Sequence, residues 1–421
     1  MRERIMNTIN NAILKGAHYV IVGNFLTKFV AFFGSIFLVR FMPKLEYGIL
    51  SYYENIYGYF LLAAGLGLAV GMLRYTVIAE QLEEKKTLYT YSIKRGELYN
   101  LIFVIIFSSI CVFFPHPDEF RNNYAVGILL VTIIPFQYLI TLNLSTLRGL
   151  FDYRSYAFMS LATSIILVLA RVIGAKIHGL YGTVSFRLMA EILCAAGCVL
   201  FVYTKYFKTV RVNFKSNLIK PLNIYSIQIM FTDGLWALFM LNDVFMLSQL
   251  SGNAAMVADY KIAYVIPANL SLISSAIGVF VAPFFTKKEN EGDHRWVKKT
   301  LFKVEMLTFG LMLAVIIICI PLSRPIITVV FGSQYLSCVS VFRILLISSL
   351  VNSGIRYTIA NVYSAIGLQK KNLIIAGIGV ILQIIINSIL IPRLGSMGAA
   401  CGSVAVQIIM STILILGIRK L

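Results

Sequence analysis

Long apolar spans recur along the whole chain, and they constrain its fold more than any other feature. Val20 to Phe41, Leu98 to Phe114 and Leu301 to Ile320 are three of them, and about 20 apolar residues suffice for a helix to cross a bilayer. Only 13% of the 421 residues are charged and 59% are hydrophobic, which leaves too few charges to cover a soluble protein of this length. We therefore predict an all-α, polytopic membrane protein.

Breaks at charged residues, proline and glycine divide these spans into about twelve predicted transmembrane helices. They cover residues 17–41, 49–73, 97–115, 124–147, 157–177, 180–203, 224–250, 258–286, 301–322, 337–364, 372–392 and 398–418. Of the Lys and Arg residues near span ends, 24 lie on the side that holds both termini and 7 on the other side. Because basic residues concentrate in cytoplasmic loops, we expect cytoplasmic N- and C-termini and a multi-pass protein of the bacterial cytoplasmic membrane. The formal charge of +19 then requires no nucleic-acid partner.

An internal repeat divides the chain into two halves. The motif Gly179-x-x-Gly182 returns in the second half as Gly395-x-x-Gly398, and Gly149-Leu150 returns at nearly the same separation as Gly367-Leu368. We predict an N-terminal six-helix lobe (1–203), a basic cytoplasmic linker (204–223) and a C-terminal six-helix lobe (224–421). Since six is even, both halves enter the membrane from the same side, which predicts two parallel bundles around a central cleft.

Charged side chains at bilayer depth cost about 2.5 to 3.5 kcal/mol each, so each of them requires a reason. The candidates for binding substrate in the cleft are Lys28, Asn24, Arg74, Arg171 and Arg356. The candidates for coupling or gating are Glu54, Asp233 and Asp243. Asn24 and Lys28 share a helical stripe with Ala31 and Ser35, and this polar stripe should face the protein interior.

Structural roles compete with these functional ones. Arg187 and Glu191 are four residues apart on one helix, which favours a structural ion pair over substrate binding. For Lys28, a substrate or gating role and a structural salt bridge are equally supported. Asp233 suits either a coupling cation or proton, or an inter-helix hydrogen bond. Helix-packing contacts are the interpretation for three polar side chains of the tenth and eleventh spans, Asn352, Gln383 and Asn387.

No cofactor, metal site or catalytic residue is predicted. The four histidines are scattered at or beyond span ends, the six cysteines form no CxxC pair, and no Walker-type phosphate loop is present. Energy for transport would then come from an ion gradient, the membrane potential or the substrate gradient, with H⁺ or Na⁺ as the coupling ion in the first case. We therefore expect a transporter and not an enzyme.

Several motifs resemble those of one transporter family. They are Leu38-Val39-Arg40-Phe41-Met42-Pro43 with Glu46-Tyr47-Gly48, Phe331-Gly332-x-x-Tyr335, and Ile391-Pro392-x-x-Gly395-x-x-Gly398-Ala399-Ala400. The chain resembles, over nearly its whole length, the Wzx-type polysaccharide and O-antigen flippases of the multidrug/oligosaccharidyl-lipid/polysaccharide (MOP) exporter superfamily.

This resemblance implies a MATE-like fold with two six-helix lobes around a cleft lined by spans one, two, seven and eight. It implies transport of a polyprenyl diphosphate-linked oligosaccharide from the cytoplasmic to the outer leaflet by alternating access, for cell-surface polysaccharide synthesis. Lys28 matches the basic position that is common in the first span of such flippases, and Asp243 matches the acidic position near the end of the seventh. Membrane lipids and glycan polymerase or assembly proteins are the partners expected besides the lipid-linked anionic glycan.

Three other functions remain open at this stage. A cation-coupled multidrug exporter of the same fold should have a site dominated by acids, whereas basic groups slightly outnumber acidic ones within the spans here. A membrane glycan polymerase or ligase should have a large external loop with catalytic Arg or His, and the predicted external loops are short. A non-transporting assembly factor is the third. The charge balance favours an anionic substrate.

Overall fold

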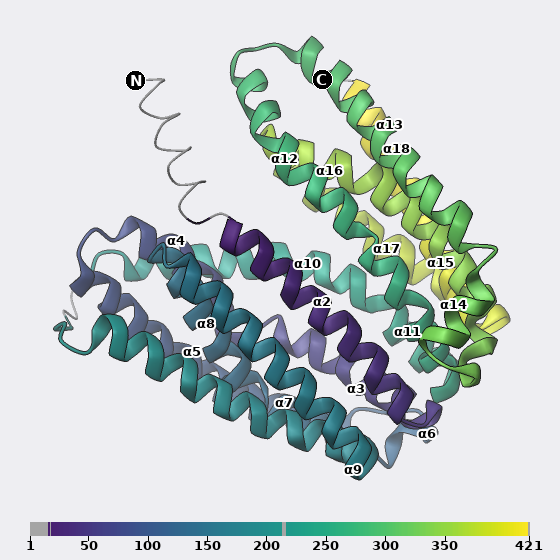
Figure 1. Ribbon diagram of the computed structural model, residues 1–421, viewed down its shortest axis with the longest axis horizontal. Helices are drawn as coiled ribbons and strands as arrows, with labels where there is room; N and C mark the ends of the chain where they lie inside the picture. Colours follow the sequence, from purple (N-terminus) through teal and green to yellow (C-terminus); the bar gives the residue numbers. More distant parts are fainter. Residues whose placement is uncertain (1–15, 17, 213–215, 420–421) are drawn as a thin grey trace. The chain divides into compact units, whose positions relative to one another are not determined.

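The structure is a computed structural model that describes residues 16, 18–212 and 216–419 (Figure 1). Five basic residues that the orientation prediction counted lie outside the described residues: Arg2, Arg4, Lys15, Lys215 and Lys420. The described residues are helical and contain no strand. They form two compact units. Unit 1 consists of Met1–Pro43, Ile56–Pro115 and Asn123–Gly234, and unit 2 consists of Lys44–Asn55, His116–Asn122 and Leu235–Leu421.

Nine helices among the described residues are long and apolar enough to cross a membrane, and the pair α3–α4, bent by 46°, forms a tenth such span. Helical residues coincide with each of the predicted spans. The boundaries differ most at α5 (Leu82–Phe113), which begins well before its predicted start at residue 97. The charged residues within the segment 83–97 lowered its hydropathy but do not stop a helix, because Glu, Lys and Arg are good helix formers.

Unit 1 is built mainly from the first six spans. Its elements are α2 (His18–Phe41), the end of α3 (Lys44–Leu61), η2 (Ala64–Gly67), α4 (Leu68–Ile78), α5, α7 (Tyr124–Val131), α8 (Ile134–Gly149), α9 (Tyr153–Val202), η3 (Tyr203–Phe207) and the start of α10 (Ile219–Ser251). The core of this unit contains Met72, Leu88, Tyr138, Leu142 and Phe207.

Small residues let α2 pack closely against α9. Gly23 contacts Ala157, and Gly34 contacts Val168, so the packed face of α2 is the row of small residues at helical spacing. The adjoining stripe is exposed at Asn24 and Lys28. Within unit 1 the small side chains of α2, and not this stripe, make the close contact with α9, and the prediction that the stripe faces the protein interior stays a prediction.

The long helix α9 folds back on itself as a hairpin of two arms (Figure 1). His178 and Gly179 have non-helical backbone angles, with φ 57° and ψ −133° at Gly179. A Cβ at Gly174 would collide with the carbonyl oxygen of Gly182. In a straight helix these two residues would be about 12 Å apart, so the contact establishes the turn. The two arms correspond to the fifth and sixth predicted spans.

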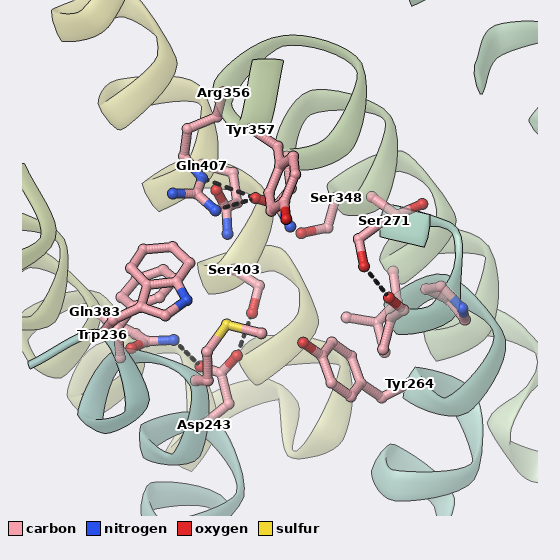
Figure 2. Close-up of a pocket in the computed structure, with 17 residues that line it drawn as sticks. Trp236, Asp243, Tyr264, Ser271, Ser348, Arg356, Tyr357, Gln383, Ser403 and Gln407 are labelled. Carbon is pink, nitrogen blue, oxygen red and sulfur yellow. Dashed lines mark hydrogen bonds between the residues drawn. The ribbon is translucent and has the colours of Figure 1, made fainter. Parts of the chain in front are cut away.

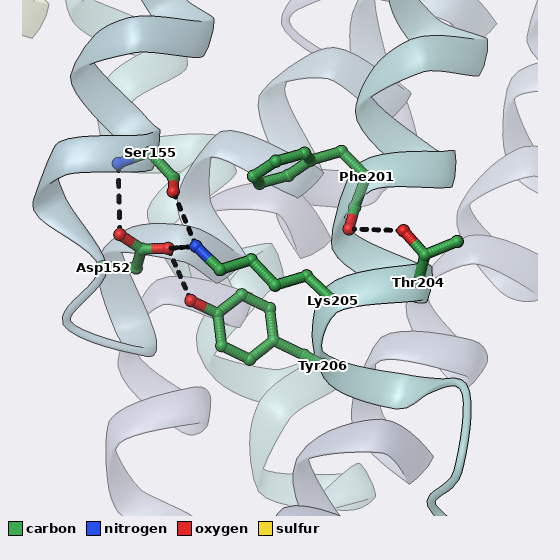
Figure 3. Close-up of polar contacts among 6 residues, drawn as sticks. All are labelled: Asp152, Ser155, Phe201, Thr204, Lys205 and Tyr206. Carbon is green, nitrogen blue, oxygen red and sulfur yellow. Dashed lines mark hydrogen bonds and ion pairs between the residues drawn. The ribbon is translucent and has the colours of Figure 1, made fainter.

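A polar cluster connects the residues at the start of this hairpin with those just after its end (Figure 3). The Asp152 carboxylate accepts hydrogen bonds from Lys205 Nζ at 2.7 Å, from the Tyr206 hydroxyl at 2.5 Å and from the backbone N–H of Ser155 at 3.1 Å. Burial acts to raise the pKa of the Asp152 carboxyl, but these hydrogen bonds outweigh burial and hold the pKa well below its ordinary value of 3.8. Asp152 is thus an N-cap that is also an ion-pair partner.

Unit 2 contains the remaining helices. They are the start of α3, α6 (Asp118–Arg121), the end of α10, α11 (Ala254–Asn269), α12 (Ser271–Asn290), α13 (His294–Cys319), α14 (Ser323–Val330), η4 (Ser333–Cys338), α15 (Val339–Val351), the π-helical turn η5 (Asn352–Arg356), α16 (Tyr357–Ala365), α17 (Gln369–Leu394) and α18 (Ser396–Arg419). A core cluster here contains Phe239, Ile359, Tyr363, Val406 and Met410.

The predicted repeat is present in the backbone of the two units. Gly395, between α17 and α18, has φ 58° and ψ −132°, which matches Gly179 in α9. Gly398 contacts the carbonyl of Leu390 as Gly182 contacts that of Gly174. Each residue of one hairpin is separated from its counterpart by the same number of positions, so the two hairpins are structural equivalents.

The second predicted match of the repeat has to be corrected. Gly367 has a left-handed φ of 82°. Its counterpart, at the same distance along the chain as Gly179 is from Gly395, is Phe151, which has a φ of 59°. The prediction paired Gly367 with Gly149, which lies two positions before Phe151. Residue identity was misleading because Gly149 is required for close packing against Thr76, whereas the left-handed position after α8 is occupied by a phenylalanine.

Candidate functional site

A cavity of about 190 Å³ lies within unit 2 and is lined by two of the predicted residues, Asp243 and Arg356 (Figure 2). We call it the C-terminal cavity. Its walls come from α10, α11, α12, α15, η5, α16, α17 and α18. Pro267 lies in this wall, just before the end of α11. A proline inside a helix removes one backbone hydrogen bond, which explains why the helix path breaks between α11 and α12 beside the cavity.

Asp243 is buried in this wall with 9% of its surface exposed. Its Oδ1 accepts hydrogen bonds from Gln383 Nε2 and Asn387 Nδ2, each at 2.7 Å, and its Oδ2 accepts from the Tyr260 hydroxyl at 2.8 Å and from the Ser403 hydroxyl. All four donors are neutral, and no basic side chain pairs with Asp243 among the described residues. Asp243 is thus a buried acidic group held by four neutral donors, without an ion-pair partner among the described residues.

The amide of Asn387 adds an unused oxygen beside this carboxylate. Asn387 is fully buried, and its Oδ1 has no hydrogen-bond partner among the described residues. Gly402 makes room for this oxygen, because a Cβ at that position would collide with it. A carboxylate with nearby amide and hydroxyl oxygens is the donor set that hard cations prefer.

Arg356 is the second charged residue of the C-terminal cavity, with only 4% of its surface exposed. Its Nε and one terminal nitrogen donate hydrogen bonds to Asn352 Oδ1 at 2.7 and 2.5 Å. The guanidinium lies 4.2 Å from the centre of the Trp236 ring, within the range of a cation–π interaction. Within the part of the chain that the structure describes, no carboxylate pairs with Arg356. This guanidinium is therefore a buried positive charge without a protein anion.

The remaining wall of the C-terminal cavity is aromatic and polar. Tyr264 and Tyr357 contribute rings, and Ser271 and Ser348 contribute hydroxyls (Figure 2). Gln407 is 6% exposed, and its Oε1 has no hydrogen-bond partner among the described residues. Such a mixture of ring surfaces and a few oriented polar groups is typical of small-molecule sites.

The structure also changes the interpretation of three polar residues. Asn352, Gln383 and Asn387, which the sequence favours as packing contacts, bind the two charged side chains of the C-terminal cavity. Asn352 lies four residues before Arg356, a spacing that brings two side chains together on a helix. Gln383 and Asn387 bind Asp243, which lies far away in the chain, so spacing alone did not identify that partner. Trp236 and Tyr260 were missed for the same reason.

The other predicted substrate residues lie in unit 1. Lys28 and Asn24 are exposed on α2, where Asn24 Oδ1 accepts a hydrogen bond from the Tyr156 hydroxyl at 2.8 Å. Arg74 is exposed on α4, with its guanidinium 4.5 Å from the centre of the Tyr225 ring. Their role in binding substrate stays a prediction.

A charged cluster lies on the α9 hairpin. Arg187 Nε is 3.6 Å from Glu191 Oε1, so the two residues form the intrahelical pair expected from their spacing. Arg187 also lies over the Tyr57 ring and donates a hydrogen bond to Gln137 at 3.4 Å. Arg171, on the other arm, is close enough to Glu191 to interact electrostatically. We call Arg171, Arg187 and Glu191 the hairpin charge cluster.

The acidic candidates outside the C-terminal cavity are less enclosed. Glu54 is half-buried on α3, and Asp233 is exposed on α10. Two further half-buried acids, Glu97 on α5 and Glu305 on α13, were not predicted, because they lie at or near the predicted starts of their spans. Among the described residues, no group of three His, Cys, Asp or Glu side chains is placed to hold a metal ion.

Solved structures of several membrane proteins share the fold of this protein. The lipid II flippase MurJ, in an inward closed conformation, superposes with a TM-score of 0.75 and 16% identity over 95% of this chain and 87% of that one. An inward-facing multidrug resistance MATE family transporter of the MOP superfamily has a TM-score of 0.73 and 14% identity over 94% of both chains. A MOP superfamily transporter from Pyrococcus furiosus has a TM-score of 0.68 and 14% identity over 97% and 95%. The protein thus has the all-α polytopic fold of these transporters, as predicted.

Sequence comparison identifies the family. The profile of the family described as polysaccharide biosynthesis protein matches residues 13–289, and the chain belongs to this family. An uncharacterized membrane protein of Methanocaldococcus jannaschii is 24% identical over 416 residues, which cover 93% of this chain and 81% of the relative. The predicted resemblance is therefore confirmed as membership in a polysaccharide biosynthesis family with a fold shared by MOP-superfamily transporters, and the flippase role and the Wzx-type assignment stay predictions.

Proposed function

We propose that this protein is a flippase for a polyprenyl diphosphate-linked oligosaccharide, which it moves from the cytoplasmic to the outer leaflet of the cytoplasmic membrane by alternating access. Membership in a polysaccharide biosynthesis family supports a glycan substrate, and the similarity to a lipid II flippase supports the mode of transport. The observation that carries the anionic nature of the substrate is Arg356, a buried guanidinium without a carboxylate partner among the described residues.

The charge argument is physical. A diphosphate-linked glycan is anionic, and the attraction between opposite charges is several times stronger inside a protein than in water. Arginine binds such oxyanions with a planar set of donors. Lys28, Asn24, Arg74 and Arg171 are proposed to add to this recognition in other states of the transport cycle.

A reconstituted assay tests this function. Full-length protein in proteoliposomes with a fluorescent polyprenyl diphosphate-linked sugar should expose the sugar to an external, membrane-impermeant quencher. We expect the Arg356→Gln variant to lower the rate at least about tenfold, since a charge-assisted hydrogen bond contributes about 1.5 to 3 kcal/mol. Arg343→Gln is the matched control, because Arg343 is exposed on α15 and bonds Ser323 outside the C-terminal cavity. Rates equal to those of empty liposomes would exclude the proposed function.

Coupling to a monovalent cation at Asp243 is the second part of the proposal. A buried carboxylate with four neutral donors and the unused Asn387 oxygen offers a site for Na⁺ or for a proton. At a Na⁺ concentration ten times the Kd, binding stabilises the folded protein by about 1.4 kcal/mol. Na⁺ should therefore raise the melting temperature of the wild type and not that of Asp243→Asn, while Asp118→Asn, an exposed control on α6, should behave as the wild type. Equal Na⁺ and pH responses in both Asp variants would exclude Asp243 as the coupling residue.

A multidrug exporter of the same fold is the competing function, favoured by the similarity to MATE transporters and by the buried acid Asp243. Such a protein would transport cationic dyes in the same proteoliposomes. Cation-driven dye efflux without movement of the lipid-linked sugar would decide for the exporter.

A further inference from the structure

The walls of the C-terminal cavity contain more recognition groups than a diphosphate or a cation requires. Tyr264 and Tyr357 present aromatic rings, and serine side chains belong to the same lining. The Gln407 Oε1 is buried without a partner among the described residues and belongs to the same lining. A buried polar atom without a hydrogen bond costs free energy, so its presence points to a ligand that donates a hydrogen bond.

The protein holds Arg356 in place but leaves some of its hydrogen-bond donors without acceptors among the described residues. A guanidinium has five N–H donors, and two of them go to Asn352 Oδ1. Stacking on Trp236 fixes the plane of the group at 4.2 Å from the ring centre. The other three donors have no acceptor among the described residues, which leaves an oriented fork for an oxyanion.

We propose that the C-terminal cavity binds one sugar unit that carries an oxyanion, with the oxyanion on Arg356 and sugar hydroxyls on Gln407 and the serines. The proposal rests on the proposed function, whose substrate contains sugars. The apolar face of a sugar ring fits an aromatic wall, and hydroxyls supply the donor that Gln407 Oε1 lacks. One water occupies about 30 Å³, so a cavity of about 190 Å³ has room for about six waters or one ring of similar volume.

Asp243 makes this binding dependent on a cation. Asp243 and Arg356 line the same cavity without forming an ion pair, and a bound oxyanion would be repelled by the Asp243 carboxylate through a medium of low dielectric constant. A cation or proton on Asp243 removes that repulsion. By linkage, the cation and the anionic sugar each strengthen the binding of the other by the same factor.

The two tryptophans of the chain allow a direct measurement. They are Trp236 in the C-terminal cavity and Trp296, which packs on Phe285. Trp296→Phe in the full-length protein in nanodiscs leaves Trp236 as the reporter. Its fluorescence should respond saturably to glucuronate or to glucose 1-phosphate, and at least about tenfold more weakly to glucose, acetate or inorganic phosphate. A preference for glucuronate would identify a sugar carboxylate as the oxyanion, and a preference for glucose 1-phosphate would identify a sugar phosphate.

Variants in the same background test the assigned contacts. Arg356→Gln should weaken the acidic sugar at least about tenfold, and Gln407→Leu should weaken it about fivefold with little change in side-chain volume. Arg343→Gln should bind as the reporter background does. Na⁺ should strengthen binding of the acidic sugar several-fold, and Asp243→Asn should remove this dependence.

The outcomes separate this proposal from the proposed function. If neither acidic sugar changes Trp236 fluorescence while the lipid-linked sugar is still flipped, the sugar subsite is wrong and the flippase stands. If the acidic sugars bind but no lipid-linked sugar is moved, the proposed function fails instead. Equal affinity for glucose and glucuronate would also overturn the role of Arg356. Gln407→Leu covers the case in which Arg356→Gln does not fold, as judged by its elution profile and circular dichroism.

Discussion

The two helical hairpins of the molecule, α9 in unit 1 and α17–α18 in unit 2, have the same turn but different polar contents. Gly179 and Gly395 have φ and ψ angles within about a degree of each other. At three further pairs of positions with the same separation along the chain, charged side chains in α9 correspond to neutral ones in α17–α18: Arg171 to Asn387, Arg187 to Ser403, and Glu191 to Gln407.

The difference shows which properties the repeat constrains. The turn and the close approach of the arms depend on glycine, so they are the same in both hairpins. The side chains that face other helices are free to specialise. In α9 the charges interact with one another, as Arg187 does with Glu191, whereas the neutral groups of α17–α18 bind Asp243 of α10. The second hairpin therefore surrounds Asp243 with neutral groups and does not supply it with an ion-pair partner.

The largest loss of stability is expected from Glu191→Gln, which gives α9 the residue type found at the equivalent position of α18, Gln407. Glu191 is almost fully buried, and its neutralisation breaks the ion pair with Arg187 and removes the electrostatic interaction with Arg171. Breaking a buried pair costs about 3 to 5 kcal/mol, which should appear as a large drop in melting temperature in detergent.

The double variant Arg187→Ser/Glu191→Gln, which installs both C-terminal residue types, is the matched comparison. It should recover part of the lost stability because it also removes the buried cation that lost its Glu191 partner. A Glu191→Gln protein as stable as the wild type would show that the hairpin charge cluster does not hold α9 together.

The next effect tests the shared turn. Gly179→Ala and Gly395→Ala should each destabilise the protein by about 1 to 3 kcal/mol, because a side chain is strained at φ near 57° and 58°. The two losses should be similar, since the backbone is the same. Gly310→Ala is the control, because Gly310 lies in α13 with nothing within 4 Å of an added Cβ; it should be neutral or slightly stabilising. Melting curves of the three variants measure these losses. Clearly different losses for Gly179→Ala and Gly395→Ala would mean that the two turns are not equivalent.

These elements also show how far the sequence could predict the structure. Apolar spans predicted the helices because a bilayer requires about 20 apolar residues per crossing. The hairpin glycines predicted the repeat because only glycine adopts their backbone angles easily. Phe151 did not reveal its place in the repeat, since a phenylalanine with a left-handed backbone cannot be recognised from the sequence.

The C-terminal cavity lay beyond sequence analysis for a different reason. Asp243 and Arg356 were candidates because charges at membrane depth require a function or a partner. Their surroundings come from residues on helices far away in the chain, such as Gln383 for Asp243 and Trp236 for Arg356. Helical periodicity reports which residues share a face, but not which helix packs against that face.

The smallest effect sharpens the comparison at the entrance of each hairpin. Asp152 N-caps α9 and pairs with Lys205, whereas its counterpart in the repeat, Leu368, precedes α17 without a side-chain cap. Asp152→Asn should lower stability at pH 7 by about 0.5 to 1 kcal/mol, a modest value because Lys205 is largely exposed.

The pH dependence of this effect has a definite sign. The pKa of Asp152 is lower in the folded protein than its ordinary value of 3.8, so the stabilisation is fully present above pH 3.8 and is lost as the pH falls further below it. The difference in melting temperature between wild type and Asp152→Asn should therefore be constant from pH 8 to about pH 5 and should shrink below about pH 4. Glu291→Gln, which removes a more exposed pair with Lys288, should show almost no difference at any pH. A difference for Asp152→Asn that grows on acidification would mean that the ionised carboxylate is not the stabilising form. The first turn of α9 would then, like that of α17, be stabilised without a charged cap.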